Sequence, residues 1–385
     1  MSRRRTLWLA SALVLVLAAL AAWQLWPRPQ IVGATVVAGA VSTEGFARAR
    51  PDVPVRLPAD QAAHPEYQTE WWYFTGNLTS PENTGEQWGY QFTIFRRALT
   101  PAETERPSAW GSNQVYLAHL AITDGERGEH VATERFSRGG AGLAGAQAQP
   151  FLVWLEDGEV KEEAPGQWRL RTSQDGYALD LTLKPGKPAI VHGKNGYSQK
   201  GSDPGNASHY YSYTRLQTTG TLTRDSQAIP VEGLSWMDHE WSTSALEAGQ
   251  IGWDWFSVQL DDGWDLMVFQ LRRADGSVDR YSSGTLVDPD GKTFPLSAGD
   301  LSIRSEGSWR SPDGAAVYPD SWRIEIPKHD LTVSLNPLVA DQEMRLSTRY
   351  WEGAAKAVGE HDGLAVQGRG YVEMTGYAAS MEGKF

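Results

Sequence analysis

The sequence predicts an all-β fold that is built twice. Short runs rich in Val, Ile, Thr, Trp and Tyr alternate with turn signals from Pro58 to the end, which is typical of antiparallel hairpins and meanders. With 39 Gly and 21 Pro, few windows of the chain could support a long helix. The strongest turn signals are Asp-Gly pairs at residues 124–125, 157–158, 175–176, 262–263, 275–276, 290–291, 313–314 and 362–363.

An internal repeat divides the chain into two similar halves. Residues 70–78, Glu-Trp-Trp-Tyr-Phe-Thr-Gly-Asn-Leu, align without a gap with residues 252–260, Gly-Trp-Asp-Trp-Phe-Ser-Val-Gln-Leu. Each segment is followed by a turn and an apolar run that ends in Arg-Arg-Ala, at residues 96–98 and 272–274. A third match in the same order pairs a Trp-Arg motif in each half. Three matches in one order indicate a duplicated domain.

The length of 385 residues suits two domains of roughly 150 residues each. Both faces of the expected strands are largely apolar, which favours closure of each half into a barrel rather than an open sheet. We therefore expect two tandem antiparallel β-barrels, over residues 58–243 and 244–385. A linker rich in Ala, Val, Gly and Pro, residues 28–57, precedes them.

The first 27 residues have the pattern of an export signal. Arg3, Arg4 and Arg5 are followed by an almost uninterrupted apolar run over residues 7–26, which Pro27 ends. A run of about 20 apolar residues also suits a membrane anchor. We expect residues 1–27 to be a signal peptide or a signal anchor, and the rest of the chain to be exported, in a bacterium to the periplasm.

The composition excludes several classes of function. Asp and Glu number 47 against 35 Lys and Arg, a net charge of −12, and such an acidic chain repels nucleic acid. The chain has no cysteine, which excludes disulfides, thiolate nucleophiles and Cys-zinc sites. The eight histidines show no ligand-like spacing, so we expect no metal site.

Alternation along the repeated strands separates two sets of side chains, because successive residues of a strand point to opposite faces. One face carries Trp71, Tyr73, Thr75 and Asn77, matched by Trp253, Trp255, Ser257 and Gln259. The other face carries Glu70, Trp72, Phe74 and Leu78 in the first copy, and Asp254, Phe256, Val258 and Leu260 in the second. Glu70 and Asp254 are candidate acids, since a carboxyl group among aromatic rings keeps its proton to higher pH. The structural alternative is an ion pair with an arginine such as Arg96 or Arg272.

A second concentration of polar groups is the segment Trp-Met-Asp-His-Glu-Trp, residues 236–241. In a strand, Asp238 and Glu240 share one face, and His239 and Trp241 share the other. His239 could shuttle a proton, with Asp238 or another carboxylate orienting its ring. A hydrogen-bonded corner between the two domains is an equally simple explanation.

A third cluster lies near the C-terminus. Tyr350-Trp-Glu-Gly353 precedes Gly-Arg-Gly-Tyr, residues 368–371, and we expect Glu352 to pair with Arg369. Closure of the second barrel is a sufficient explanation for this segment. The 17 tryptophans are unusually many, and a surplus lining a cavity would suit a long apolar ligand. The expected ligand-binding residues are Trp71, Trp72, Tyr73, Trp241, Trp253, Trp255 and Tyr350.

The repeated segments, residues 236–242 and residues 368–377 together resemble the carotenoid 1,2-hydratase (hydroxyneurosporene synthase) family and its AttH-like relatives, over roughly residues 58–385. The resemblance implies two lipocalin-like barrels and, in the hydratases, addition of water to a terminal C=C bond of an acyclic carotenoid without a redox cofactor. It carries an active-site role to Asp238, His239 and Trp241 directly, and to Asp254 less directly. Other relatives are associated with ABC-type membrane exporters.

The resemblance leaves three functions open. The first is an exported protein that binds a long apolar lipid or isoprenoid and works with an ABC-type permease. The alternative is a cofactor-independent hydratase, in which Asp254 or Asp238 gives the proton and His239 positions the water, while Trp241, Trp253 and Trp255 stabilise the cation. The third is an ester hydrolase that uses Ser235 or Ser242, although the chain has no Gly-x-Ser-x-Gly motif.

Overall fold

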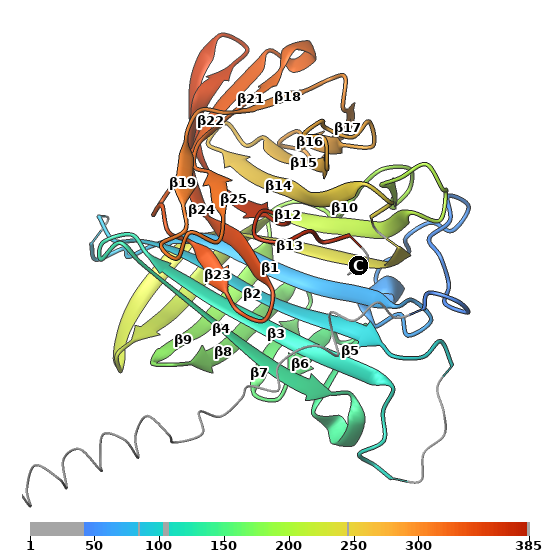
Figure 1. Cartoon of the computed structure of the whole chain (residues 1–385). Coiled ribbons are helices and arrows are strands. Elements are labelled where there is room, and N and C mark those ends of the chain that lie inside the picture. Colours follow the sequence, from blue (N-terminus) through green and yellow to red (C-terminus); the bar gives the residue numbers. More distant parts are fainter. Residues whose placement is uncertain (1–41, 84, 103–107, 245, 383–385) are drawn as a thin grey trace, which may run out of the picture. The chain divides into compact units, whose positions relative to one another are not determined.

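The computed structural model describes residues 42–83, 85–102, 108–244 and 246–382, and it confirms the all-β prediction. Two antiparallel sheets contain almost all of the strands (Figure 1). The helices of the described part are three short 3-10 turns, η1 (Ala59–Gln61), η2 (Gly140–Gly142) and η3 (Pro327–His329). Accordingly, no described helix has the length and apolar character needed to cross a membrane. The expected signal segment, residues 1–27, lies outside the described residues.

The first sheet runs in the order β4-β3-β2-β1-β13-β12-β9-β8-β7-β6-β5, with β10 and β11 paired to β12. Arg135 of β4, at one end of this order, donates to Gln174 of β8, so the sheet curves back on itself and nearly closes a barrel. The strands are β1 (Thr69–Thr79), β2 (Gln87–Ala98), β3 (Gln114–Asp124), β4 (Glu129–Arg138), β5 (Ala144–Gln147), β6 (Leu152–Leu155), β7 (Gly158–Ala164), β8 (Gln167–Gln174), β9 (Tyr177–Pro185), β10 (Ile190–Val191), β11 (Tyr197–Gln199), β12 (Ala207–Arg224) and β13 (Gln227–Ser244).

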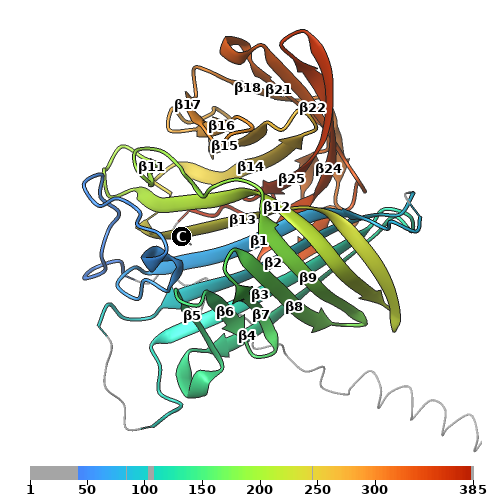
Figure 2. The same ribbon diagram turned by 180° about the vertical axis from the view of Figure 1, so that it is seen from behind.

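The second sheet runs in the order β17-β16-β15-β14-β25-β24-β22-β21-β18 (Figure 2). β23 pairs with β24, and β19 and β20 form a separate hairpin. Its strands begin after residue 249. They are β14 (Gln250–Leu260), β15 (Asp265–Arg273), β16 (Ser283–Val287), β17 (Thr293–Ser297), β18 (Ser302–Ser305), β19 (Ser308–Arg310), β20 (Val317–Pro319), β21 (Trp322–Ile326), β22 (Leu331–Pro337), β23 (Glu343–Arg345), β24 (Arg349–His361) and β25 (Leu364–Met374).

The repeat found in the sequence appears as the same strand order in both sheets. The central strands β1 and β14 hold the matched segments, and each is flanked by the strand that ends in Arg-Arg, β2 or β15. On the other side, the order β13-β12-β9-β8 corresponds to β25-β24-β22-β21, which places the Trp-Arg motifs in equivalent strands. Two copies of one topology follow from one duplicated pattern of strands and turns.

Alternation along the central strands gives each sheet two buried faces, as the sequence predicted. Trp72 and Phe74 of β1 belong to the core of the first barrel, and Phe256 and Val258 of β14 belong to the core of the second. The opposite faces meet each other. The rings of Tyr73 and Trp255, at matched positions of the repeat, contact edge to face with centroids 5.4 Å apart.

Hydrogen bonds join the two sheets in a nearly reciprocal way. Asn77 of β1 donates to the carbonyl of Gly370 in β25 (3.1 Å), and its counterpart Gln259 of β14 donates to the carbonyl of Ser235 in β13 (3.0 Å). Both amide side chains are buried. The duplicated halves are therefore packed about an internal pseudo-two-fold relation, and what lies between them is part of the interior.

The described part of the expected linker, residues 42–57, contacts the first sheet. Phe46 and Ala49 are buried there, and the amide of Ala47 donates to the carbonyl of Glu66. The boundary between the two sheets falls between Ser244 and Gln250. Both sheets belong to one compact unit.

Candidate functional site

The structure distributes the predicted site residues over three places. Alternation along β13 sends His239 and Trp241 into the first barrel and Asp238 toward the second sheet. Asp254 points into the second barrel, where it contacts Tyr377 (3.2 Å). The expectation that Asp238, His239 and Asp254 serve one reaction centre is therefore wrong, because successive residues of a strand face opposite sides of the sheet.

Inside the first barrel, Glu70 is the centre of a charged cluster. Its Oε1 accepts from His64 Nδ1 (2.7 Å) and from His239 Nε2 (2.8 Å), and its Oε2 accepts from Arg96 Nε (2.7 Å). The carboxylate that orients His239 is thus Glu70, one of the two alternatives for that ring. Tyr211 contacts the other ring nitrogen of His239 (3.1 Å), so the imidazole is fixed at both ends.

The charges of this cluster keep Glu70 ionised. Burial alone would raise the pKa of Glu70, but Arg96, His64 and the hydrogen bonds outweigh it and hold that pKa well below its usual range. Burial would lower the pKa of His64, but Glu70 and Asp60 raise it to about 9. Burial lowers the pKa of His239 to about 4. The prediction that Glu70 retains its proton is wrong, and the arginine pairing is its role.

His64, Glu70 and His239 place three potential metal-ligating atoms within 4.8 Å of one another. The geometry does not favour a cation there. The guanidinium of Arg96 lies 2.7 Å from the same carboxylate, and both oxygens of Glu70 already accept hydrogen bonds. The network is complete without an ion, so its arrangement gives no reason to place one.

The second barrel also contains a buried carboxylate paired with an arginine, with fewer partners than Glu70 has. Asp254 accepts from Arg272 Nε (3.0 Å) and from Gln270 (2.8 Å), and it is fully buried. Arg272 is the repeat counterpart of Arg96, although the two acids are not at aligned positions. Burial raises the pKa of Asp254 despite the charge of Arg272. Among the alternatives for Asp254, the arginine pair is the one that the structure contains.

Asp238 lies between the sheets with donors around it. The indole of Trp236 (2.6 Å), the hydroxyl of Tyr210 (2.9 Å) and the hydroxyl of Ser212 all donate to its carboxylate. Burial raises the pKa of Asp238 to about 7, against the effect of these donors. Trp255 donates in turn to Tyr210 (3.1 Å). Three donors on one carboxylate favour a fixed acceptor over a proton donor.

A pair of carboxyl groups that the sequence analysis did not select occupies the same interface. Glu352 of β24 and Glu373 of β25 are directly opposite each other in neighbouring antiparallel strands. Such partners on one face of a sheet have Cβ atoms about 5 Å apart. Glu352 is fully buried, Glu373 is partly exposed, and neither has an ion-pair partner among the described residues. Two unpaired carboxyls this close cannot both be ionised at little cost.

The pKa values of this pair follow from its surroundings. Burial and the neighbouring Glu373 raise the pKa of Glu352 well above its usual value. Burial raises the pKa of Glu373 to about 7, although the indole of Trp253 donates to its carboxylate (2.9 Å). At neutral pH the pair therefore holds at least one proton. The expected ion pair of Glu352 with Arg369 is wrong, because Arg369 is opposite Lys356, four residues further along β24.

Several buried polar atoms without a hydrogen-bond partner lie on the facing sides of the two sheets, where this pair also lies. Native interiors rarely leave such atoms unsatisfied, and a concentration of them marks a place for water or a ligand. They are Tyr73 Oη, Thr75 Oγ1, Gln91 Oε1, His119 Nε2, both carboxyl oxygens of Glu352, and Tyr371 Oη. All of these residues lie on the facing sides of β1, β2, β3, β24 and β25.

The predicted ligand-binding residues divide between the two environments. Trp72 and Trp241 are in the core of the first barrel, where Trp72 stacks on His239 and Trp241 stacks on His64. The others lie on the faces between the sheets, where Trp71 and Trp253 are only partly buried. These are Trp71, Tyr73, Trp253, Trp255 and Tyr350.

Two further features carry no chemistry. The proposed hydrolase serines contact other groups: Ser235 accepts from Tyr90 (2.7 Å), and Ser242 donates to the carbonyl of Ala207 (2.8 Å), so neither is oriented by His239.

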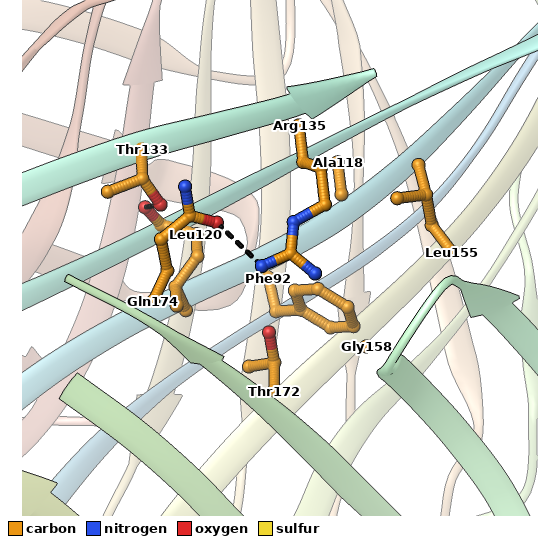
Figure 3. Close-up of a pocket in the computed structure, with 9 residues that line it drawn as sticks. All are labelled: Phe92, Ala118, Leu120, Thr133, Arg135, Leu155, Gly158, Thr172 and Gln174. Carbon is orange, nitrogen blue, oxygen red and sulfur yellow. Dashed lines mark hydrogen bonds between the residues drawn. The ribbon is translucent and has the colours of Figure 1, made fainter. Parts of the chain in front are cut away.

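A shallow pocket of about 250 Å³ lies where Arg135 and Gln174 approach each other at the edge of the first barrel (Figure 3). That volume includes open solvent, and the enclosed space is only about that of one water molecule, which is too small for a ligand site.

The fold and the buried acids define the class of protein as a tandem lipocalin-like barrel with an acidic and aromatic interface. The AttH-like family matches residues 48–377, and the chain belongs to that family. The crystal structure of an AttH protein from Nitrosomonas europaea is similar, with 35% identity, a TM-score of 0.76, and coverage of 86% of this chain and 99% of that one.

Two comparisons concern a hydratase. The sequence is 21% identical to kievitone hydratase of Fusarium solani subsp. phaseoli over 334 residues, which is 84% of this chain and 87% of that protein. The crystal structure of kievitone hydratase from Nectria haematococca has the same fold, with a TM-score of 0.63 at 18% identity and coverage of 88% of this chain and 98% of that one. The resemblance stated from the sequence is confirmed at the level of the AttH-like family.

Proposed function

We propose that this protein is a hydratase that adds water to a C=C bond of an apolar, isoprenoid-type substrate, and that the pair Glu352–Glu373 supplies the acid. The observation that carries the proposal is the pairing of these carboxyls across β24 and β25, buried and without a cation. The likeness to a protein named as a hydratase supports the reaction class. Binding by an exported carrier that works with an ABC-type permease, and a location in the periplasm, stay predictions from the sequence.

The reaction requires a neutral acid in a dry place. Glu352 gives its proton to one carbon of the C=C bond, and the electron pair of that bond forms the new C–H bond. The more substituted carbon becomes a cation, which a water molecule attacks through oxygen. The second proton of that water passes to a carboxylate of the pair, so water is consumed, the pair recovers its proton, and no electrons leave the system.

Aromatic rings next to the acid suit the cationic intermediate. Tyr73 and Trp255 contact each other at the interface, and the face of an aromatic ring attracts a cation by about 1–2 kcal/mol. That contribution is modest, so the strength of the acid matters more. Trp253 holds Glu373 in place by its indole hydrogen bond, and both residues are partly exposed. They mark the side from which substrate and water approach Glu352.

The test uses the full-length protein and a panel of acyclic prenoid alkenes in H₂¹⁸O. Mass spectrometry follows incorporation of the label. We expect Glu352→Gln to lower the rate by a factor of about 10²–10⁴, because the amide cannot give the proton. Asp254→Asn is the matched control, since Asp254 is a buried acid with an arginine partner, and its variant keeps the rate within a few-fold when folded.

The pH dependence adds a second criterion. Because the acid must be protonated, the rate falls as pH rises through the apparent pKa of the pair, and the value of about 7 for Glu373 places that fall near neutrality. An unchanged rate in Glu352→Gln would contradict the assignment of the acid. Retention of a prenoid by the wild-type protein with no label incorporated would contradict hydration and favour a carrier.

A further inference from the structure

His119 connects the two sheets at a point next to the carboxyl pair. It lies on β3 of the first sheet and is 2% exposed, and its Nδ1 is 2.7 Å from the hydroxyl of Tyr350 on β24 of the second sheet. The two rings stack with centroids 5.8 Å apart, and Phe95 packs against the edge of the imidazole. The imidazole is therefore fixed in position, with one nitrogen committed to Tyr350.

The other nitrogen is buried and faces Glu134. His119 Nε2 has no hydrogen-bond partner, and it is 3.9 Å from Oε2 of Glu134. The Glu134 side chain is 21% exposed, and the amide of Ser347 holds it by donating to Oε1 (3.0 Å). A separation of 3.9 Å is too long for a hydrogen bond, but one water or a small shift of Glu134 spans it.

On the inner side of His119, Tyr350 leads to Glu352. Tyr350 and Glu352 are two residues apart on β24, so their side chains share the face that meets the first sheet. Each group also shifts the pKa of the other. Burial and, second to it, the charge of Glu352 raise the pKa of Tyr350, and the Tyr350 hydroxyl opposes the rise in the pKa of Glu352. Glu134, His119, Tyr350 and Glu352 thus follow one another from the surface to the buried acid.

We propose that His119 and Tyr350 form a proton path that connects Glu352 with solvent at Glu134. The proposal rests on the proposed role of Glu352 as the acid, and it makes His119 and Tyr350 relay residues that do not touch substrate. Glu352 is fully buried, and such a path would exchange its proton on the side opposite the approach at Trp253 and Glu373, even when substrate occupies that approach.

The transfer is balanced at each step. A proton arrives at Nε2 of His119 from Glu134 or its water, the proton on Nδ1 passes to the oxygen of Tyr350, and the hydroxyl proton of Tyr350 passes to the carboxylate of Glu352. His119 is left in its other tautomer, and the reverse transfer restores it. Burial lowers the pKa of His119 to about 3, so the ring stays neutral and does not retain the proton.

The test measures proton exchange directly rather than turnover. The full-length protein is mixed rapidly into D₂O, and infrared spectroscopy follows the C=O band of the buried carboxylic acid as it becomes deuterated. Glu352→Gln assigns the band. We expect His119→Phe and Tyr350→Phe each to slow the shift of the band at least about tenfold. Tyr371→Phe is the matched control, because it removes a hydroxyl near Glu352 that is not on the path.

The outcomes separate the two proposals. A band that is present in the wild type and exchanges slowly in both relay variants, but at the wild-type rate in Tyr371→Phe, supports the path. A band that exchanges equally fast in His119→Phe and Tyr350→Phe overturns the path and leaves Glu352 as the acid. A wild type without the band overturns the protonated state of Glu352, and with it both the path and the proposed acid.

Discussion

Buried carboxyl groups occur in two settings in this molecule, inside the barrels and between them. Glu70 and Asp254, inside the barrels, each contact an arginine at the end of the neighbouring strand, 2.7 Å and 3.0 Å away. Glu352 and Glu373, between the barrels, are opposite each other on neighbouring strands, and neither forms an ion pair with a described residue. Glu70, Asp254 and Glu352 are all fully buried and Glu373 is partly exposed, so Glu352 differs from the first two in its partner rather than in its burial.

That difference decides what each carboxyl group can do. An arginine beside a buried carboxylate favours its charged form and fixes the structure around it. The arginine also holds the backbone: Arg96 donates to the carbonyls of His64 and Tyr67, and Arg272 donates to the carbonyl of Thr375. A buried carboxyl without a cation keeps its proton and is available for chemistry. The duplicated fold thus uses Glu70 and Asp254 for architecture within each half and leaves Glu352 and Glu373 without a cation where the halves meet.

The largest expected effect comes from removing the arginine of the first barrel. Arg96→Leu leaves Glu70 buried without its strongest counter-charge, and we expect a loss of about 3–5 kcal/mol in the free energy of unfolding, measured by urea denaturation. Arg272→Leu is the comparison. The Arg272 side chain is 15% exposed and that of Arg96 is fully buried, so the loss should be smaller. An Arg96→Leu protein as stable as the wild type would mean that the pair is not structural.

The pH dependence of stability distinguishes the two settings next. The folded-state pKa of Glu352 is raised above the ordinary value of 4.5, so above pH 4.5 the folded protein binds the proton more tightly than the unfolded chain does. Its contribution to stability is therefore lost as pH rises. Glu70 has a lowered pKa, and its contribution is lost as pH falls below 4.5. The two settings act on opposite sides of the stability curve.

The corresponding experiment compares Glu352→Gln with the wild type between pH 5 and pH 7. Relative to the wild type, the variant should gain about 1 kcal/mol of unfolding free energy per pH unit, since it lacks the titrating group. Histidines that titrate between pH 5 and pH 7 contribute equally to both proteins, so their contribution is absent from the difference between variant and wild type. Glu360→Gln, an exposed position on the same strand, should show a constant difference. A flat difference for Glu352→Gln would mean that Glu352 is ionised in the folded protein.

Sequence reasoning reached the fold because its signals are local. The repeat, the Asp-Gly turns and the alternation of Trp71, Trp72 and Tyr73 each depend on neighbouring residues, and the structure has the duplicated sheets and the two faces that they predict. Alternation also separated Asp238 from His239. The prediction of one reaction centre was wrong because it followed the family motif, in which Asp238 and His239 are adjacent in sequence, and not the alternation that places them on opposite faces.

The carboxyl pair and the cluster of Glu70 could not be found in this way. Glu352 and Glu373 meet only through the register of β24 against β25, and each alone resembles any acidic residue in a strand. His64 lies outside any strand, and its contact with Glu70 depends on how the segment after η1 folds over the barrel. One local signal was available: Glu352 and Glu373 both stand in aromatic segments at positions whose alternation points away from the barrel core.

The smallest expected effect concerns the reciprocal hydrogen bonds at the centre of the comparison. Asn77→Ala removes one bond between the sheets, and we expect a loss of about 1 kcal/mol in the free energy of unfolding. Gln259→Ala removes two, to the carbonyls of Thr214 (2.7 Å) and Ser235, and should cost about twice as much. Asn83→Ala, at an exposed turn, is the control and should be nearly neutral. A larger loss of stability in Asn77→Ala than in Gln259→Ala would contradict this prediction. The number of hydrogen bonds would then not determine what each half contributes to the interface, and the pseudo-symmetry would apply to the backbone but not to these side chains.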